Sequence, residues 1–214
     1  MPQPLNSWKE TPSQTAGPYV HIGLTPSVAG LQGPFPDPGK EIAGPNATGE
    51  RIAIEGVVHD RHGAPMRDCV VELWQADAAG IYNSPDDPRF ADRDPGVFGW
   101  GRAAADLQTG LYRFETVKPG PVPTPLPGGR TAIMAPHALL WIVARGINVG
   151  LLTRVYFADE GEANAADPIL GRLEHQDRRA TLIAPREETG DGAPPVYRFD
   201  VRLGGPHETV FFDA

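Results

Sequence analysis

The strictest constraint on the fold is an uninterrupted alternation of apolar and charged side chains near the carboxyl end. Tyr197, Phe199, Val201 and Leu203 are separated by Arg198, Asp200 and Arg202. Successive side chains of a β-strand point to opposite faces, so this period of two predicts a strand with one buried face. An α-helix would scatter the same apolar residues around its circumference.

Other segments extend this pattern through the chain. Further predicted strands cover residues 51–58, 69–76, 112–116, 138–145 and 152–158. The last two are more uniformly apolar than the others, which is typical of central strands that are covered on both faces. The clearest helix signal is Asp167-Pro168, a cap and first-turn proline that predict a short helix reaching Glu174.

Glycine and proline dominate the connecting segments. The 214 residues include 25 glycines and 24 prolines, and residues 1–49 show no sustained periodicity. Several strands with long loops and little helix favour a β-sandwich. We therefore expect an all-β fold: a sandwich of mixed or antiparallel strands over 50–214, with long Pro/Gly-rich loops, an extended N-terminal arm over 1–49 and one short helix.

Charge and composition exclude several classes of function. A formal net charge of −8 disfavours nucleic acids and anionic membranes, which require a basic surface. The longest strongly apolar run, 138–144, is too short to cross a bilayer, and the first residues lack the apolar core of a secretory signal. One cysteine, Cys69, forbids an internal disulfide and fits a reducing compartment. A cytoplasmic location is the simplest prediction.

The common catalytic signatures are absent from the sequence: there is no C-x-x-C, H-E-x-x-H, G-x-S-x-G or Walker loop. Cys69 lies within an alternating strand, which predicts a buried, inert thiol. His59 and His62 flank a predicted turn and are interpreted as solvated residues. His137 opens an apolar strand, where it could be a hydrogen-bonded core residue or a ligand. No second ligand lies near it in sequence.

A set of nine segments carries a resemblance to a known family. The segments are TPSQTAGPYVHIGL (11–24), VELWQADAAGIY (71–82), YRFETVKPG (112–120), MAPH (134–137), ARGIN (144–148), TRVYFADE (153–160), RRATLIA (178–184), YRFD (197–200) and ETVFFDA (208–214). Together they resemble the intradiol ring-cleaving dioxygenases, in family order over nearly the whole chain. Among these enzymes the chain is similar to an α subunit that does not bind iron.

The resemblance implies that Fe(III) is bound by a sister chain, the β subunit, through two tyrosines and two histidines. Phenolate oxygen suits ferric iron, and imidazole completes the coordination. Tyr82 matches the first tyrosine pattern, in WQADAAGIY, but Val122 stands where the second tyrosine is expected. His137 matches the first histidine of an H-x-H pair, and Leu139 stands in place of the second. We interpret the four as vestigial ligand positions, so this chain is expected to hold neither metal nor a complete catalytic site.

The resemblance also implies substrate-binding residues in this chain. They are Thr15, Gly17, Pro18 and Tyr19 in the arm, and Arg145 in ARGIN. Gly17 would allow the backbone close to a flat ring, and Pro18 offers a rigid apolar surface. Arg145 can pair with a substrate carboxylate. The alternatives are an ordinary turn before a strand for the arm residues and a surface ion pair for Arg145.

The implied reaction is Fe(III)-dependent cleavage of protocatechuate by O₂ to 3-carboxy-cis,cis-muconate, at a site shared with the β subunit. The implied assembly contains twelve α/β pairs. One alternative is a self-sufficient intradiol catechol dioxygenase, which would need replacements for Val122 and Leu139. The other is a non-enzymatic β-sandwich binding module of transthyretin-like type, which explains the fold but not the full ordered set of segments.

Overall fold

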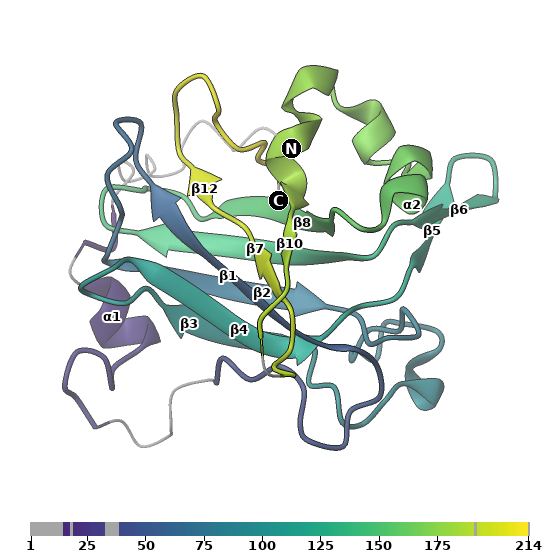
Figure 1. Cartoon of the computed structure of the whole chain (residues 1–214), viewed down its shortest axis with the longest axis horizontal. Coiled ribbons are helices and arrows are strands. Elements are labelled where there is room, and N and C mark those ends of the chain that lie inside the picture. Colours follow the sequence, from purple (N-terminus) through teal and green to yellow (C-terminus); the bar gives the residue numbers. More distant parts are fainter. Residues whose placement is uncertain (1–14, 18, 33–38, 191, 214) are drawn as a thin grey trace, which may run out of the picture.

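The computed structural model describes residues 15–17, 19–32, 39–190 and 192–213, and two layers of β-sheet form its centre (Figure 1), with β5 and β6 in a separate hairpin. The strands are β1 (Arg51–His59), β2 (Cys69–Gln75), β3 (Trp100–Ala104), β4 (Leu111–Val117), β5 (Val122–Leu126), β6 (Arg130–Met134), β7 (His137–Ala144), β8 (Leu151–Phe157), β9 (Ile183–Ala184), β10 (Arg186–Glu187), β11 (Val196–Arg198) and β12 (Val201–Arg202). The α-helices are α1 (Tyr19–Leu24) and α2 (Gly161–Ala166), and the 3₁₀ turns are η1 (Phe90–Asp92), η2 (Leu170–Arg172) and η3 (Gln176–Leu182).

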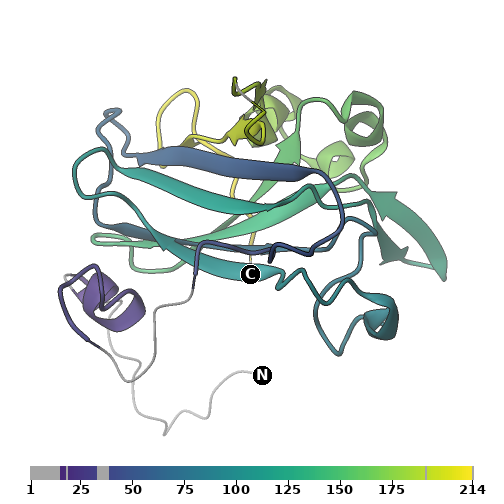
Figure 2. The ribbon, with the colours of Figure 1, turned by 60° about the horizontal axis from the view of Figure 1, so that its bottom comes forward.

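The two layers are mixed sheets, seen nearly edge-on in Figure 2. In the first layer β4 pairs antiparallel with β1, while β11 and β12 run parallel to β1. In the second layer the order is β3-β2-β7-β8-β9, antiparallel except for the β8–β9 pair. The predicted all-β sandwich is therefore confirmed, and 138–145 and 152–158 are central strands of the second sheet, as expected.

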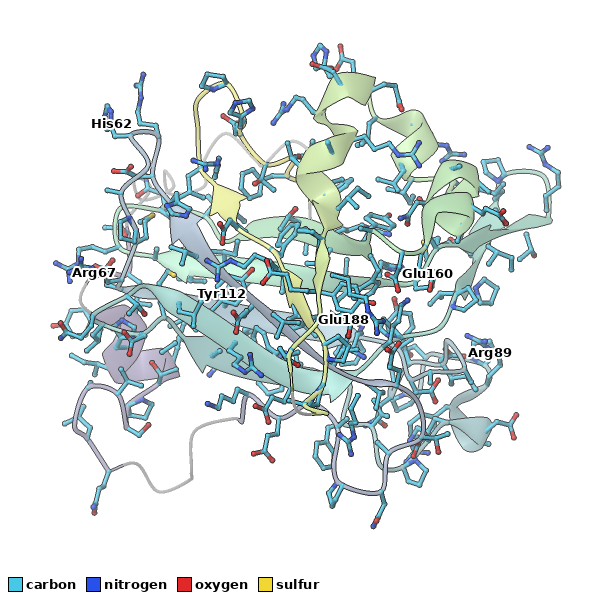
Figure 3. All side chains as sticks on the ribbon, viewed as in Figure 1. His62, Arg67, Arg89, Tyr112, Glu160 and Glu188 are labelled. Atoms are coloured by element: carbon cyan, nitrogen blue, oxygen red, sulfur yellow. The ribbon has the colours of Figure 1, made fainter. Side chains whose placement is uncertain are left out.

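The core lies between the layers, where the alternating residues meet. Tyr112, Phe114 and Tyr197 from the first layer are fully buried and pack in one cluster with Leu73 and Leu140 from the second. Figure 3 places Tyr112 in the middle of the molecule. Burial of such large apolar side chains contributes roughly 1.5–3 kcal/mol each relative to exposure, so this shared cluster joins the two sheets into one unit.

The C-terminal alternation that most strongly predicted a strand is interrupted at Asp200. Strands β11 and β12 flank a break in which the Asp200 carboxylate accepts the backbone N–H of Val57 at 2.9 Å. The Phe199 carbonyl approaches β1 closely, and a side chain at Gly56 would lie 1.8 Å from its oxygen. The Tyr112 hydroxyl donates to the same carbonyl at 2.5 Å. Side-chain hydrogen bonds thus replace part of the expected strand ladder.

The helix expected over 167–174 is wrong in extent. Helix α2 ends where the predicted helix should begin, and only the single turn η2 follows. Asp167 does act as a cap, because its carboxylate accepts the backbone N–H groups of Ile169 and Leu170, each at 2.8 Å. The described residues also contain α1, η1 and η3, rather than one short helix.

The described part of the arm packs against the sandwich at several points. Val20 of α1 is buried, and the Leu24 carbonyl accepts a hydrogen bond from Arg102 of β3. Farther along, Ile42 is fully buried in the shared core. The alternative for residues 15–19, an ordinary turn before a strand, does not hold, because helix α1 begins at Tyr19. Among the described residues, no helix combines the length and apolar character needed to span a membrane.

Candidate functional site

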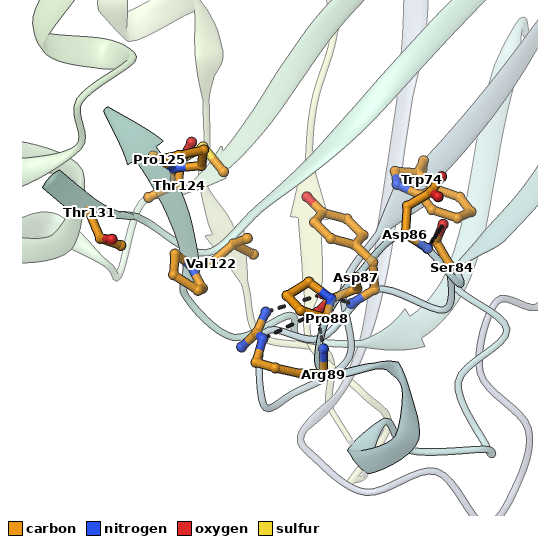
Figure 4. Close-up of a pocket in the computed structure, with 13 residues that line it drawn as sticks. Trp74, Ser84, Asp86, Asp87, Pro88, Arg89, Val122, Thr124, Pro125 and Thr131 are labelled. Atoms are coloured by element: carbon orange, nitrogen blue, oxygen red, sulfur yellow. Dashed lines mark hydrogen bonds and ion pairs between the residues drawn. The ribbon is translucent and has the colours of Figure 1, made fainter. Parts of the chain in front are cut away.

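The four expected ligand positions lie near one end of β7. His137 is the first residue of β7, and Leu139 lies two residues further on the same face. Tyr82 comes from the loop after β2, and Val122 is the first residue of β5. Tyr82 and Val122 border one pocket of about 600 Å³, shown in Figure 4. The topology therefore brings together side chains that are up to 57 residues apart, as the resemblance implied.

The loop that carries Tyr82 is organised around the buried Asp77 carboxylate. One Asp77 oxygen accepts the backbone N–H groups of Ala79 and Ile81, each at 2.9 Å, and the other accepts that of Asp94 at 2.8 Å. A short polar side chain that bonds to nearby backbone groups is a common device for fixing a tight turn. Asp77 therefore fixes the path of the chain immediately before Tyr82.

A glycine locks this loop against the segment that leads to Val122. Gly80 has a φ of +76°, and a Cβ at this position would lie 2.0 Å from the Pro121 carbonyl oxygen. Only glycine adopts such a conformation without strain while permitting this approach. The contact brings Tyr82 and Val122 to the same pocket, where Tyr82 packs against a cluster of Ala76, Val122 and Met134.

Tyr82 and His137 form a neutral hydrogen-bonded pair. His137 Nδ1 lies 2.7 Å from the Ala135 carbonyl oxygen, and because a carbonyl only accepts, this nitrogen carries the proton. Nε2 is then the acceptor for the Tyr82 hydroxyl at 3.4 Å. Burial lowers the pKa of His137 to about 4 and raises the pKa of Tyr82. Both side chains are uncharged at neutral pH.

A cationic side chain stands beside this pair. Arg154 of β8 is directly opposite Leu139, and its Nη1 lies 3.5 Å from the Met134 sulfur. Burial has the largest effect on both groups: it raises the pKa of Tyr82 and lowers the pKa of His137. The Arg154 charge has a smaller effect and lowers both pKa values. A positive charge next to a prospective metal site opposes a second cation there.

These residues do not fit the family's ferric centre. Val122 and Leu139 offer no donor atom, and the two surviving donors bond to one another. Within the described ranges, no three of the His, Cys, Asp and Glu side chains gather as a metal-binding group. A ferric ion at this place would therefore lack two of the family's four protein ligands.

The pocket has apolar walls and a hydroxyl-rich rim. Its lining consists of Trp74, Tyr82, Ser84, Asp86, Asp87, Pro88, Arg89, Val122, Pro123, Thr124, Pro125, Thr131 and Met134. Trp74 stacks on Tyr82 with 5.8 Å between ring centres and 5° between planes. Arg89 is held by the Asp87 carboxylate and the Gly80 carbonyl. The β5–β6 hairpin forms the opposite wall (Figure 4).

The expected substrate-binding residues gather elsewhere, beside the loop after β7. The Thr15 hydroxyl accepts the Gly146 N–H at 3.0 Å and donates to the Ile147 carbonyl at 3.4 Å. Gly17 has a φ of +55°, and Tyr19 is 71% exposed on α1. Pro18 lies outside the described residues. The arm is therefore attached to the loop that carries Arg145.

Arg145 follows the last residue of β7 and forms an ion pair with Asp68, with 2.7 Å between Nε and Oδ2. Its side chain is 61% exposed. Eight residues of extended strand separate it from the His137 end, a span of roughly 25 Å at about 3.3 Å per residue. In Figure 1, α1 and the β5–β6 hairpin mark these opposite ends. Arg145 consequently does not face the Tyr82 pocket of its own chain.

Sequence reasoning missed two parts of this region. Arg154 interrupts an otherwise apolar run in LLTRVYF, and that isolated charge was the available signal. The prolines and threonines of the β5–β6 hairpin carried no comparable signal, because their role as a pocket wall depends on the loop after β2. The inert Cys69 was predicted correctly: it is fully buried, and burial raises its pKa to about 12.

Comparison with known proteins identifies the family. A family profile described as "Dioxygenase" matches residues 37–205. The protocatechuate 3,4-dioxygenase alpha chain of Pseudomonas putida is 44% identical over 98% of this chain and 99% of its own length. The alpha chain of the same name from Burkholderia cepacia is 42% identical over 98% and 100%.

The chain belongs to the intradiol ring-cleavage dioxygenase family.

The resemblance inferred from the nine segments is thus confirmed. A second kind of chain is also similar. The protocatechuate 3,4-dioxygenase beta chain of B. cepacia is 36% identical over 75% of this chain and 67% of its own length. Members of this family are non-haem iron oxidoreductases.

Solved structures of intradiol enzymes share the fold. Hydroxyquinol 1,2-dioxygenase from P. putida DLL-E4 has a TM-score of 0.56 at 19% identity, covering 87% of this chain and 73% of that one. Catechol 1,2-dioxygenase from Pseudomonas arvilla C-1 has a TM-score of 0.55 at 21% identity, covering 76% and 54%. At these identities the likeness supports the sandwich architecture alone.

Proposed function

We propose that this chain is the alpha subunit of a protocatechuate 3,4-dioxygenase and acts with a beta subunit that binds Fe(III). The observation that carries the proposal is the separation of two residue groups along β7. The incomplete ligand set, Tyr82 and His137 with Val122 and Leu139, lies at one end. Thr15 and Arg145 lie at the other end, and the described residues show no group of metal-ligating side chains there.

The reaction assigned to the pair is insertion of O₂ into the protocatechuate ring between its hydroxyl-bearing carbons, giving 3-carboxy-cis,cis-muconate. Ferric iron, when bound by the partner, supplies a template and Lewis acid for the catechol oxygens. The alpha chain contributes the surroundings of the substrate. Its role is to position and enclose the ring, without a catalytic residue of its own.

The arm provides a rigid edge for that enclosure. Thr15 fixes it to Gly146 and Ile147 through two hydrogen bonds. Gly17, without a side chain, allows the backbone to approach a flat ring, and Pro18 and the exposed Tyr19 follow it. Because these contacts exist within the single chain, the arm is prepared for the substrate before the partner binds.

Arg145 is the group that recognises the substrate carboxylate. Its guanidinium is fixed on one side by Asp68, through Nε, and is otherwise largely exposed. A guanidinium has five N–H donors, so bonding to Asp68 leaves donors for a second carboxylate. The family resemblance of ARGIN and the position beside the arm support this role.

The partner surface assigned to the beta subunit is the outer face of the second sheet, between the two ends of β7. Trp100 and Trp141 are exposed on this face by 36% and 37%. Exposed tryptophans are enriched where subunits meet. A beta chain covering this face contacts the arm and Arg145 at one edge. Assembly into twelve such pairs is proposed from the family resemblance.

The test is co-expression of this chain with a beta chain encoded beside it. We expect the two to co-purify with a single ferric site per pair and with protocatechuate-cleaving activity, while this chain purified alone contains no stoichiometric iron. Ferric iron in the isolated chain, with a visible phenolate charge-transfer band, would establish a self-sufficient enzyme instead. Recovery without any iron-bearing partner would favour the transthyretin-like binding module.

A further inference from the structure

The β5–β6 hairpin projects beyond the two layers at one end of the molecule (Figure 2) and forms a two-stranded sheet of its own. One of its faces carries exposed apolar side chains, with Ile133 exposed by 56% and Pro123 opposite it. A two-stranded sheet has two edges, and an edge whose backbone groups are unpaired can receive another strand. The two edges of this hairpin differ sharply in that respect.

The outer edge of β5 is closed by proline. Pro123 faces Ile133 and Pro125 faces Thr131. Since proline has no N–H, neither pair can exchange both backbone hydrogen bonds, and these are the pairs of an antiparallel ladder whose backbone groups point away from the partner strand. The outer edge of β5 therefore lacks the donors that a further strand needs, which is where proline is tolerated in a sheet.

The outer edge of β6 is open. Because the pairs of the ladder alternate, the N–H and C=O groups of Thr131 and Ile133 point away from β5. The next residue in this series, Ala135, donates its N–H to the Asp167 carboxylate at 2.8 Å. In the described part of the chain, no residue forms a hydrogen bond with the outward groups of Thr131 and Ile133. These groups can receive a strand from outside.

The open edge is complementary to itself. When a second copy places its β6 antiparallel to this one, Thr131 of each copy faces Ile133 of the other, and each facing pair exchanges both backbone hydrogen bonds. A shift in one direction would need the Ala135 N–H, which Asp167 already binds. A shift in the other direction would need Gly129, whose φ of +74° is not that of a strand. The structure therefore permits a single register.

The side chains agree with this register. Arg130 of each copy faces Met134 of the other, so no two like charges lie opposite one another. Thr131 and Ile133 are β-branched and suit a pleated sheet. The product is a four-stranded sheet with the prolines of β5 at both outer edges, so pairing ends at two copies. Such a sheet is more stable than an isolated two-stranded hairpin.

We propose that β6 is a contact surface for a second copy of this chain. The two β6 strands pair antiparallel about a two-fold axis at Ala132 and join the copies edge to edge. The contact is isologous, because the same residues contribute from both sides. It involves the hairpin alone and does not depend on the reaction or the beta subunit proposed above.

The test is covalent trapping, because a strand edge of this length makes a small interface. Ala132→Cys places two thiols opposite each other on the axis, where facing Cα atoms lie about 4.5 Å apart, within disulfide range. Oxidation with copper phenanthroline is applied to the alpha–beta complex, or to this full chain where no partner co-purifies. We expect a linked product of twice the 23.0 kDa chain mass. The native Cys69 is fully buried and does not compete.

The first control is Thr124→Cys. Thr124 is half-buried like Ala132 and faces it from β5. In the paired hairpins the two Thr124 positions lie three strand spacings apart, about 14 Å, which is too far for a disulfide. This variant should give no linked product, whereas random collisions between copies would link both variants.

A second pair of variants tests the backbone hydrogen bonds. Ile133→Pro, added to Ala132→Cys, removes the outward N–H and leaves the pairing with β5 intact. The yield of linked product should fall about tenfold or more, because both facing pairs lose a hydrogen bond. Ile133→Val keeps the N–H and should retain the yield. Urea unfolding verifies that each variant is folded.

Three results overturn the proposal: no linked product from Ala132→Cys, equal linking by Thr124→Cys, or an undiminished yield in the Ile133→Pro variant. A product whose mass shows this chain linked to a beta chain also overturns it, because the edge then serves a different partner. Iron content and protocatechuate cleavage of the same samples report separately on the proposed function. That function can therefore fail while the linked product still forms.

Discussion

The Tyr82 hydroxyl lies 3.4 Å from Nε2 of His137, so two side chains at ligand positions satisfy each other's hydrogen-bonding needs. Neither requires a metal to avoid a buried, unpaired polar atom. Val122 and Leu139 can therefore occupy the other two positions without leaving the Tyr82 hydroxyl or the His137 imidazole unpaired. The two side chains thus form a neutral hydrogen-bonded pair at ligand positions. The effect of burying His137 can be measured as a pH dependence of the unfolding free energy.

The first prediction concerns pH. The folded pKa of His137 is about 4 because the imidazole is buried, whereas in the unfolded chain it is about 6.5. Between these two pH values the unfolded chain binds a proton that the folded chain does not. The contribution of neutral His137 to the unfolding free energy is therefore complete above pH 6.5 and is lost as the pH falls toward 4. The loss amounts to about 3 kcal/mol of unfolding free energy. Urea unfolding at a series of pH values measures it.

The control for this prediction is His137→Asn, whose side-chain amide can still donate to the Ala135 carbonyl but does not titrate in this range. Its unfolding free energy should fall less steeply between pH 6.5 and 4 than that of the wild-type chain. Acidic groups affect both proteins equally, so the difference between the two curves isolates His137. Parallel curves would contradict the assignment of a depressed pKa.

The second prediction concerns Gly80. Gly80→Ala should lower the unfolding free energy by roughly 2–4 kcal/mol, because it combines a positive φ with a Cβ that would lie 2.0 Å from the Pro121 oxygen. Gly161→Ala is the matched control, since φ is not positive there and no atom lies within 4 Å of the added Cβ. Chemical denaturation compares them, and equal stability would mean that the loop tolerates the substitution.

Local pattern predicted the sandwich because strand periodicity depends only on neighbouring residues. It failed where distant groups decide the structure. The alternation through Asp200 predicted one strand. The structure has two strands instead, because the Asp200 carboxylate accepts the Val57 N–H and the Phe199 carbonyl accepts the Tyr112 hydroxyl. Similarly, the Asp167 cap was recognisable, but the length of the following helix depended on packing beyond it.

Some residues of the candidate site were likewise predicted from the sequence, and others were missed. The family resemblance identified Tyr82 and His137 as ligand positions, and the structure places the two side chains within 3.4 Å of each other. Arg145 was left between a surface ion pair and a substrate contact; the structure shows the pair with Asp68, and the substrate contact stays a proposal. Arg154 was missed because its position beside Tyr82 and His137 depends on strand pairing: it lies opposite Leu139, and its Nη1 is 3.5 Å from the Met134 sulfur.

The third prediction concerns the single cysteine. Cys69 is fully buried, and burial raises its pKa to about 12, so almost no thiolate exists at pH 8 in the folded protein. We expect no reaction with a chromogenic disulfide reagent on the timescale of minutes in buffer, and complete reaction in urea. Rapid labelling of the folded chain would show that the β2 region opens readily.

The last prediction concerns Arg145 in the alpha–beta complex. Arg145→Ala should raise the KM for protocatechuate about 5- to 150-fold, equivalent to losing roughly 1–3 kcal/mol of interaction with the carboxylate. Unfolding free energy should change by less than about 1 kcal/mol, because the Asp68 pair is a surface interaction. Asp68→Asn is the matched control: it removes the same ion pair but keeps the guanidinium, so its KM should remain near that of the wild-type complex. If both variants lose affinity equally, the ion pair itself shapes the pocket, and if neither does, Arg145 does not contact the substrate.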